Sequence, residues 1–366
     1  MTTILASASP GEVRVAALDA DGLLDVALWR LGAPDGVGDL HCGRVTARMP
    51  ALAGSFIAIG GADGFLPDSE GASGEGAMLG VRVTRAAQGG KGPRLTAKLN
   101  EAERALVGGG PPALLRRGPN AIERLAALHP DAPVLVDDTV LLAMLRPPLG
   151  ARVSLVARAF DDDIEAMFEA LGEPECALPG GARMSVHPTP ALTAIDVDLA
   201  AASAGRGGKA ATHAAGNRAL LPALARQIRL RNLAGAILVD LAGLSPRRRA
   251  ALGPDFVAAL ADDPLRPRFL GFSALGLAEI LRGRVHPPLH ELLAGPHAAG
   301  LSALRRLAAE IAARPDRPPR LAAAPAVAAA LERDAPALAD LARRAGRPLM
   351  LRPEPGLAPL GWRIEE

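Results

Sequence analysis

The fold is decided by residues 191–240, where ALTAIDVDLAAASAGRGGK (191–209) and RNLAGAILVD (231–240) flank a segment rich in Ala, Leu and Arg. Each flank holds a short, largely apolar run, 192–195 or 236–239, that stops at an aspartate. Such runs predict buried strands, and the segment between them has the length and composition of a helix. The sequence therefore predicts a strand–helix–strand unit, whose right-handed crossover makes the two strands parallel.

The two aspartates that end these strands, Asp196 and Asp240, are the candidate chemical centre. Parallel strands bring their carboxyl ends to the same edge of a sheet, where open α/β sheets bind ligands. Two carboxylates at that edge suit a hard cation, Mg²⁺ or Mn²⁺. We therefore expect the pair to bind a divalent metal.

Other polar residues near this pair have two explanations each. Asp198 follows Asp196 by two residues and points to the same side of an extended segment, either as a third metal ligand or as a solvated loop acid. Arg206 and Lys209 lie in the glycine-rich loop after Asp196, where they could reach a phosphate group.

The overall composition is that of a globular protein with no global nucleic-acid signature. The 366 residues are 49% hydrophobic and 22% charged, which suits two or three domains. The formal net charge is +2, so a nucleic-acid site must come from local patterning. Arginine is abundant throughout and is by itself weak support for phosphate binding. Arg226 and Arg229, on one face of the expected helix, could bind phosphate or be structural.

Cysteine usage and the N-terminus favour a reducing cytoplasm. Cys42 and Cys176 are the only cysteines and no CxxC motif exists, so no zinc site of the cysteine type is expected. The N-terminal MTTILASASPGEVR lacks the basic start and apolar core of a signal peptide. No apolar run is long enough to predict a membrane span.

Residues 36–99 differ from the rest because short β-like runs alternate with glycine-rich turns. Several short strands at this spacing predict a small barrel or sandwich, and the length suits an OB-fold barrel. Phe56 lies in an alternating strand and Phe65 follows an Asp-Gly turn. On the open face of an OB-fold such aromatics stack on bases; the alternative is that both belong to the barrel core.

Elsewhere the pattern predicts a mixture of strands and helices. We expect a hairpin at 12–31, a buried strand at 133–136 and a helix at 161–171 with an acidic first turn. After Asp240 we expect a helix from 246 to about 261, a strand at 268–272 and a helix at 273–284. Residues 298–366 form a compact αβ unit that could provide a dimer face or simply cover the core.

Three segments resemble one family, the bacterial ribonuclease E/G endoribonucleases. GDLHCGRVTARMPALAGSFIAIGGADGFLP (38–67), with GGKGPRLTAKL (89–99), resembles the family's RNA-binding barrel. ARQIRLRNLAGAILVD (225–240), preceded by LTAIDVD, is similar to its catalytic core and is the most specific match. FLGFSALGLAEILRGRVHPPL (269–289) resembles a third family segment.

The resemblance implies an α/β (multidomain α+β) fold. An OB-fold RNA-binding domain (36–100) would be inserted in an RNase H-like subdomain (1–35 with 112–188). A DNase I-like catalytic domain (189–292) and a small C-terminal αβ domain (293–366) would follow. The implied activity is magnesium-dependent hydrolysis of phosphodiester bonds in single-stranded RNA, in RNA processing or decay.

The same resemblance implies roles for particular residues. Asp196 and Asp240 match the aspartates that bind catalytic Mg²⁺, and Asp198 stands where the family usually has Asn. Further matches concern RNA binding: Phe56 and Phe65 in the barrel channel near the cleavage point, Lys91 and Arg94 in the basic loop before the LT strand, and Arg282 and Arg284 at the basic end of the last catalytic-domain helix.

The departures from the family pattern are equally specific. The family's segment for sensing a 5′ monophosphate has no counterpart, because Leu99 leads through GGGPP almost directly to LLRRGPN. The family's CPxCxGxG zinc link is replaced by HELLAGPHAAG (290–300), so no zinc is expected. The sequence thus predicts an endoribonuclease that does not sense the 5′ end.

A second hypothesis is a catalytically impaired RNA-binding protein of the same family, because Asp198 and the LAGL that follows Asp240 alter the surroundings of the site. A third takes AIDVDL as the DxD of a phosphatase-type fold. It has little support, since no partner lysine motif is present.

Overall fold

The strand–helix–strand unit expected at 191–240 is present in the computed structural model, which describes residues 1–199, 209–241, 243–316 and 318–365. Strand β14 (Leu192–Asp198) and strand β15 (Gly235–Leu241) are parallel neighbours joined through helix α5 (Lys209–Leu230). Apolar side chains of both strands face α5 and form the largest core of the molecule with it. The predicted crossover is therefore confirmed.

These two strands lie in the middle of a six-stranded mixed sheet, which we call the catalytic sheet because it carries the residues to which the sequence assigns catalysis. Its order is β12-β13-β14-β15-β17-β16, and every pairing except β14–β15 is antiparallel. Helices α5 and α7 pack on one face. The remaining elements of this domain are β12 (Glu175–Ala177), β13 (Arg183–Pro188), α6 (Pro246–Ala250), α7 (Gly253–Leu260), β16 (Arg268–Phe272), β17 (Ala278–Arg282) and α8 (Leu289–Leu292).

The prediction of a helix at 273–284 is wrong, because this segment is a turn followed by strand β17. The Ser273 hydroxyl accepts a hydrogen bond from the Leu277 N–H, and Gly276 adopts a φ of 87°. That closes a hairpin between β16 and β17. Alternate residues of β17 are buried, among them Arg282 at 3% exposure. The guanidinium of Arg282 contacts the Asp263 carboxylate at 2.7 Å and donates to Asn232 Oδ1 at 2.7 Å.

The N-terminal part forms a five-stranded sheet between two layers of helices. Its order is β11-β10-β1-β2-β3. Helices α2 and α3 cover one face, whereas α4 and side chains of α5 and α8 cover the other. The elements are β1 (Thr3–Ser9), β2 (Glu12–Asp19), β3 (Gly22–Arg30), α2 (Ala121–Leu128), β10 (Val134–Val136), α3 (Thr139–Leu149), β11 (Val153–Leu155) and α4 (Asp162–Ala170).

Between β3 and α2 the chain leaves this domain and forms a closed barrel of five strands. Strand β4 pairs with β7 on one side and β5 on the other, which closes the ring β4-β5-β6-β8-β7. The elements are β4 (Leu40–Met49), β5 (Gly54–Ala58), β6 (Asp63–Pro67), β7 (Met78–Arg85), β8 (Arg94–Thr96), α1 (Glu101–Ala105) and β9 (Ala113–Arg116). Because β9 pairs with β4, the barrel sheet extends beyond residue 100.

A similar shift applies at the start of the catalytic domain. Strand β13 pairs with β14 along its whole length, and β12 pairs with β13. Residues 175–188 thus belong to the catalytic sheet, although the sequence assigned 112–188 to the subdomain before it. Long-range pairing of short strands decides both boundaries.

The C-terminal residues form a small αβ unit, as expected. Its sheet has the order β19-β18-β20, with helices α9, α10 and α11 around a separate core. The elements are α9 (Gly295–Ala313), β18 (Arg320–Ala323), α10 (Pro325–Glu332), α11 (Ala335–Ala345), β19 (Met350–Pro353) and β20 (Trp362–Ile364).

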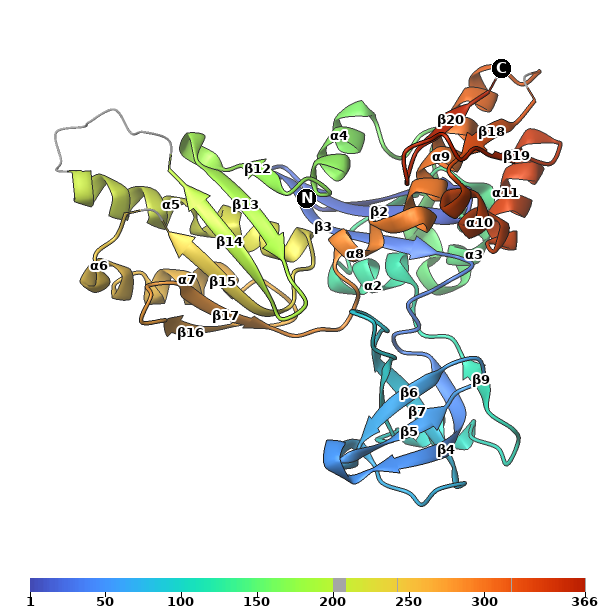
Figure 1. Cartoon of the computed structure of the whole chain (residues 1–366), viewed down its shortest axis with the longest axis horizontal. Coiled ribbons are helices and arrows are strands. Elements are labelled where there is room, and N and C mark those ends of the chain that lie inside the picture. Colours follow the sequence, from blue (N-terminus) through green and yellow to red (C-terminus); the bar gives the residue numbers. More distant parts are fainter. Residues whose placement is uncertain (200–208, 242, 317, 366) are drawn as a thin grey trace.

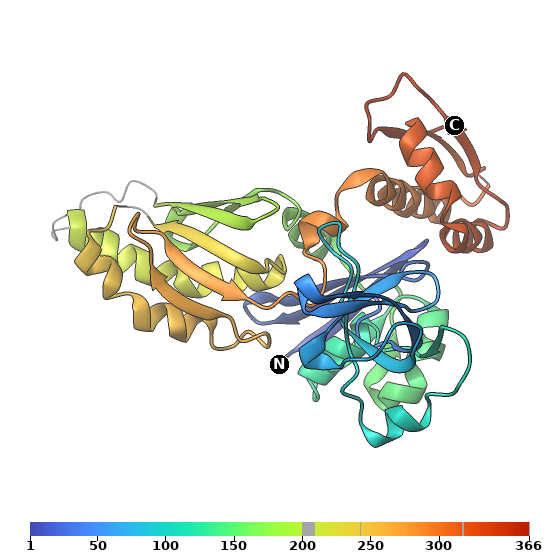
Figure 2. The ribbon, with the colours of Figure 1, turned by 60° about the horizontal axis from the view of Figure 1, so that its bottom comes forward.

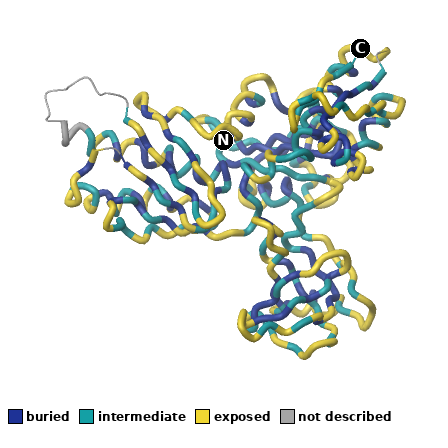
Figure 3. The backbone as a smooth tube through the Cα atoms, viewed as in Figure 1, coloured by how far each residue is buried: buried dark blue, intermediate teal, exposed yellow. Residues whose placement is uncertain are grey.

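Figure 1 shows the N-terminal domain in the middle, the catalytic sheet on one side of it and the C-terminal unit on the other, with the barrel standing out from this row. The turned view in Figure 2 shows the same separation of catalytic sheet and C-terminal unit. Buried segments follow the strands of each unit (Figure 3). Across the described residues, no helix combines the length and apolarity that crossing a membrane requires.

Arginines of α5 join the catalytic domain to the N-terminal domain. Arg226 contacts the Asp19 carboxylate at 3.3 Å, and Arg229 forms an ion pair with Asp25. The structural explanation of these two arginines is therefore the one that the contacts support.

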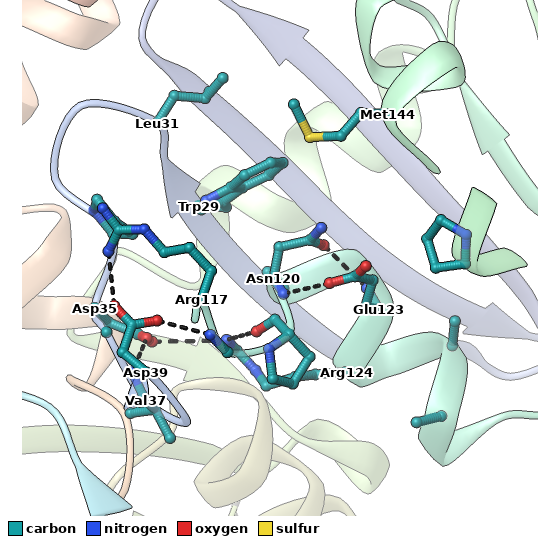
Figure 4. Close-up of a pocket in the computed structure, with 18 of the residues that line it drawn as sticks. Trp29, Leu31, Asp35, Val37, Asp39, Arg117, Asn120, Glu123, Arg124 and Met144 are labelled. Atoms are coloured by element: carbon teal, nitrogen blue, oxygen red, sulfur yellow. Dashed lines mark hydrogen bonds and ion pairs between the residues drawn. The ribbon is translucent and has the colours of Figure 1, made fainter. Parts of the chain in front are cut away.

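Two chain segments, one after β3 and one before α2, connect the barrel to the N-terminal domain, and we call them the stem. Two aspartates hold the stem in place (Figure 4). Asp39 accepts from Arg117 at 2.6 Å and from the Gly118 N–H at 2.7 Å, which ties together the two chain segments of the stem. Gly38 and Gly118 touch there so closely that a β-carbon on Gly118 would lie 2.8 Å from the Gly38 Cα. Asp35 accepts from His286 Nδ1 at 2.6 Å, so the stem is also tied to the segment after β17.

We predict that Arg282→Ala lowers the free energy of unfolding by about 3–5 kcal/mol, because it leaves the buried Asp263 carboxylate without its partner. Urea unfolding of the full chain, followed by circular dichroism, measures the change. The matched control is Arg268→Ala, whose side chain is exposed and for which we expect a change within roughly 0.5 kcal/mol. Equal effects of the two substitutions would refute a structural role for Arg282.

The stem also predicts a pH dependence. Burial raises the pKa of Asp35, but the His286 hydrogen bond, the charges of Arg124 and His286 and the Val37 N–H together bring that pKa below its usual value. The stabilisation is then complete above the ordinary carboxyl pKa and is lost as pH falls through the lowered one. Asp35→Asn should therefore flatten the acid limb of a stability–pH profile. An unchanged acid limb would contradict the prediction.

Candidate active site

The aspartate pair lies on the face of the catalytic sheet opposite α5, which we call the open face. Strand alternation places Ile195 and Val197 toward α5 and exposes Asp196 and Asp198 on the other side. Asp240 is exposed in the same way on β15, and the register sets it directly beside Asp196. Neighbouring strands are about 4.8 Å apart, so the two carboxylates can share one cation.

The donor set fits a hard divalent cation, since two exposed carboxylates offer oxygen ligands and leave room for water and a substrate. Among the described residues no three His, Cys, Asp or Glu side chains gather closely enough to hold a metal ion. Asp198 thus does not complete a three-ligand cluster here. It lies one step further along β14, where its cross-strand neighbour is Arg183.

Two polar residues that the sequence reasoning missed lie on the open face next to the pair. Ser185 of β13 is the cross-strand neighbour of Asp196, so Ser185, Asp196 and Asp240 form a row across three strands. His187 Nε2 lies 3.0 Å from the Ser185 hydroxyl. The alternation of Met184 and Val186 with these polar residues is the signal that could have placed them on this face.

The two basic residues expected in the loop after Asp196 cannot be placed. Arg206 falls outside the described residues, and Lys209 begins α5 but its side chain is likewise outside the description.

The aromatic pair of the barrel lies outside its core. Phe56 and Phe65 are cross-strand neighbours with ring centroids 5.7 Å apart, whereas the core consists of other residues such as Ile57 and Leu66. Both rings are half-buried. Arg94 is the cross-strand neighbour of Phe65 and is exposed. The barrel thus presents two rings beside a cation.

Lys91 is exposed in the turn that precedes β8, where it pairs with Gln88. The residues that the resemblance assigns to RNA on the barrel therefore come from neighbouring β5, β6 and β8 and the turn before β8. They do not meet the aspartate pair, because the carboxyl ends of β14 and β15 point away from the barrel (Figure 1). The expected place of the two rings near the cleavage point is not seen.

The two arginines at the end of the third family-like segment have different environments. Arg282 is buried in its ion pair with Asp263, so its assignment to RNA binding is wrong and its role is structural. Arg284 is exposed just beyond β17. The basic end of a helix expected there is in fact the end of a strand.

Comparison with known proteins finds one matching protein family. The model of the Ribonuclease E/G family matches residues 140–285, which run from α3 past β17 and contain the whole catalytic sheet. Through this segment, which is less than half of the chain, the protein is similar to the ribonuclease E/G family. The barrel lies outside the matched residues, so its likeness to the family's barrel rests on the motifs alone.

Relatives match over a similar length. The chain is 32% identical over 157 residues to ribonuclease E of Escherichia coli strain K12, which is 41% of this chain and 15% of that protein. It is 35% identical over 148 residues to ribonuclease E of Nostoc sp. strain PCC 7120, or 40% of this chain and 21% of that protein. Ribonuclease G of E. coli K12 is 32% identical over 133 residues, 36% of this chain and 27% of that protein. The matches thus span a quarter or less of most of these relatives.

The aspartate pair predicts metal binding that can be measured without RNA. Mn²⁺ titration followed by electron paramagnetic resonance should show one site, weakened at least tenfold by Asp196→Asn or Asp240→Asn, because each removes one of two charged ligands. Asp198→Asn is the internal comparison, and we expect a smaller effect. Undiminished Mn²⁺ binding in both single variants would rule out this site.

Proposed function

We propose that this protein is a magnesium-dependent endoribonuclease that cuts single-stranded RNA. The observation that carries the proposal is the level placement of Asp196 and Asp240 on an exposed sheet face within the family segment. RNA phosphodiester hydrolysis needs charge neutralisation on the phosphate and an activated water. Mg²⁺, or Mn²⁺ in its place, would supply both when bound.

The chain's own residues would divide the remaining work. Asp196 and Asp240 would hold the cation. The Ser185–His187 pair, next in the cross-strand row, offers polar groups to order water beside the scissile phosphate. The flat, exposed surface around them suits a flexible strand better than an enclosed small molecule.

The barrel supplies the reason that RNA arrives. We propose that it is an OB-fold domain whose outer rings, Phe56 and Phe65, stack on bases, with Lys91 and Arg94 contacting phosphates. Arg206 and Lys209 would also contact RNA, a role that rests on the sequence alone. The N-terminal and catalytic domains would correspond to the RNase H-like and DNase I-like units of the family.

Independence from the 5′ end is part of the proposal. Between β8 of the barrel and α2 the chain forms only a short helix and a short strand, α1 and β9, which leaves no room for a separate sensing domain. The chain would then bind internal single-stranded segments and cut them whatever group ends the RNA.

The decisive experiment is cleavage of an unstructured RNA oligonucleotide by the full chain with Mg²⁺. We expect Asp196→Asn and Asp240→Asn each to slow cleavage at least about 100-fold, since each removes several kcal/mol of transition-state stabilisation. RNAs with a 5′ monophosphate and a 5′ hydroxyl should be cut at similar rates.

Two outcomes would change the proposal. Metal-independent binding without cleavage, unaltered by either substitution, would support an RNA-binding protein that has lost catalysis. A strong preference for the monophosphorylated RNA would contradict the argument from the missing sensor segment. Arg158→Gln, an exposed substitution on the N-terminal domain, is the control and should leave cleavage unchanged.

A further inference from the structure

Between the barrel and the catalytic sheet lies a hollow of about 580 Å³ that is lined mainly by arginine. Arg85 and Arg94 reach it from the barrel. Arg266, Arg268 and Arg284 reach it from the strands β16 and β17 and their flanks. Arg282 also contributes to the wall, but its charge is paired with Asp263. Within the part of the chain that the structure describes, no acidic residue lines the hollow. We call the site formed by Arg85, Arg94, Arg266, Arg268 and Arg284 the arginine hollow.

These five guanidinium groups lack the partners that other arginines of the chain have. Arg14, Arg82 and Arg229 all form ion pairs with carboxylates. In the part of the chain that the structure describes, none of the five forms an ion pair or a side-chain hydrogen bond. Like charges gathered in one concavity repel each other, so the hollow favours a bound polyanion.

Local features of the chain bring the two halves of the hollow together. The Ala86 N–H donates to the Val285 carbonyl at 2.8 Å, which joins the end of β7 to the segment after β17. Arg284 lies across Gly235, where a β-carbon would come within 2.4 Å of its guanidinium. Burial, Arg94 and Arg284 each lower the pKa of Arg85. The charges are therefore close enough to act on a common ligand.

The hollow and the aspartate pair occupy opposite ends of the same open face. Arg268 is level with exposed Leu281, and Gly235 begins β15, which ends near Asp240. Asp240 lies five steps along the strand from Gly235, or about 17 Å. Exposed Ala236 and half-buried Leu238 lie between them on the same face, and half-buried Glu279 of β17 is the cross-strand neighbour of Leu238.

We propose that the arginine hollow binds phosphate groups of the RNA strand at a site separate from the aspartate pair. Guanidinium groups bind phosphate with two parallel hydrogen bonds, and several in one hollow suit consecutive phosphates. Phe65 adjoins Arg94, so bases can stack on the barrel while the backbone enters the hollow and continues along β15. The inference rests on the proposed function and adds Arg85, Arg266 and Arg268 to the RNA site.

The test is RNA binding by the full chain in EDTA, where cleavage does not interfere. Fluorescence anisotropy with an unstructured RNA should give a Kd at least roughly tenfold weaker for the double variant Arg266→Gln with Arg284→Gln. The slope of log Kd against log salt should fall by about 1.4, because each lost phosphate contact removes about 0.7.

The control variant is Arg306→Gln with Arg333→Gln. It removes the same charge from exposed positions on α9 and just after α10. We expect its Kd and salt slope to stay within twofold of the parent chain. Thermal melting shows whether each variant is folded. The single variant Arg85→Gln is an independent test of the hollow and should also weaken RNA binding. If the hollow and control variants bind RNA equally, the inference is wrong.

Two RNA ends distinguish the source of the phosphate. Equal weakening for 5′-hydroxyl and 5′-monophosphate RNA places internal phosphates in the hollow. Weakening confined to the monophosphorylated RNA places the terminal phosphate there. Failure of the proposed hydrolysis is seen separately. If the chain binds RNA through the hollow but never cuts it, this inference stands and the proposed hydrolysis is wrong.

Discussion

The parallel pairing of β14 with β15 is the constraint on which the site depends. A crossover through α5 puts both strands in the same direction, and the register makes Asp196 and Asp240 exact neighbours. A shift by one residue would turn one carboxylate into the core beneath α5 and bury it without a partner. The apolar residues on the other face, Ile195 and Val239 among them, prevent that shift. Core packing and the geometry of the carboxylates are therefore set by the same register.

The sequence allowed the central unit and its aspartates to be predicted because their signal is local. Short apolar runs, a terminal aspartate and a helix-length connection all lie within 50 residues. The errors arose where long-range pairing decides. The helix predicted at β17 is wrong because Ala, Leu and Glu favour helices, whereas pairing with β15 and β16 makes the segment a strand. The same holds for β9 and β13, whose partners lie in other segments.

Arg282 shows a second limit of sequence reasoning. Its position in a family-like motif suggested RNA, yet its contacts are Asp263, Asn232 and the Leu233 carbonyl. A motif that contains arginine does not indicate whether the guanidinium is buried in the core or exposed to solvent. The difference between Arg282 and Arg284 follows from strand alternation and the hairpin geometry. The position of Ser185 beside Asp196 was missed for the same reason. It depends on the register between two strands, which the sequence alone does not reveal.

The stem of the barrel has a consequence for how this chain could have been assembled. Gly38 and Gly118 touch, and the single carboxylate of Asp39 fastens the outgoing strand to the returning one. An insertion whose ends meet in this way leaves its host almost undisturbed. In the host, β3 and α2 on either side of the insertion pack directly together. The barrel is thus an insertion that could be lengthened at its far end, whereas its base is held by contacts with the segment after β17.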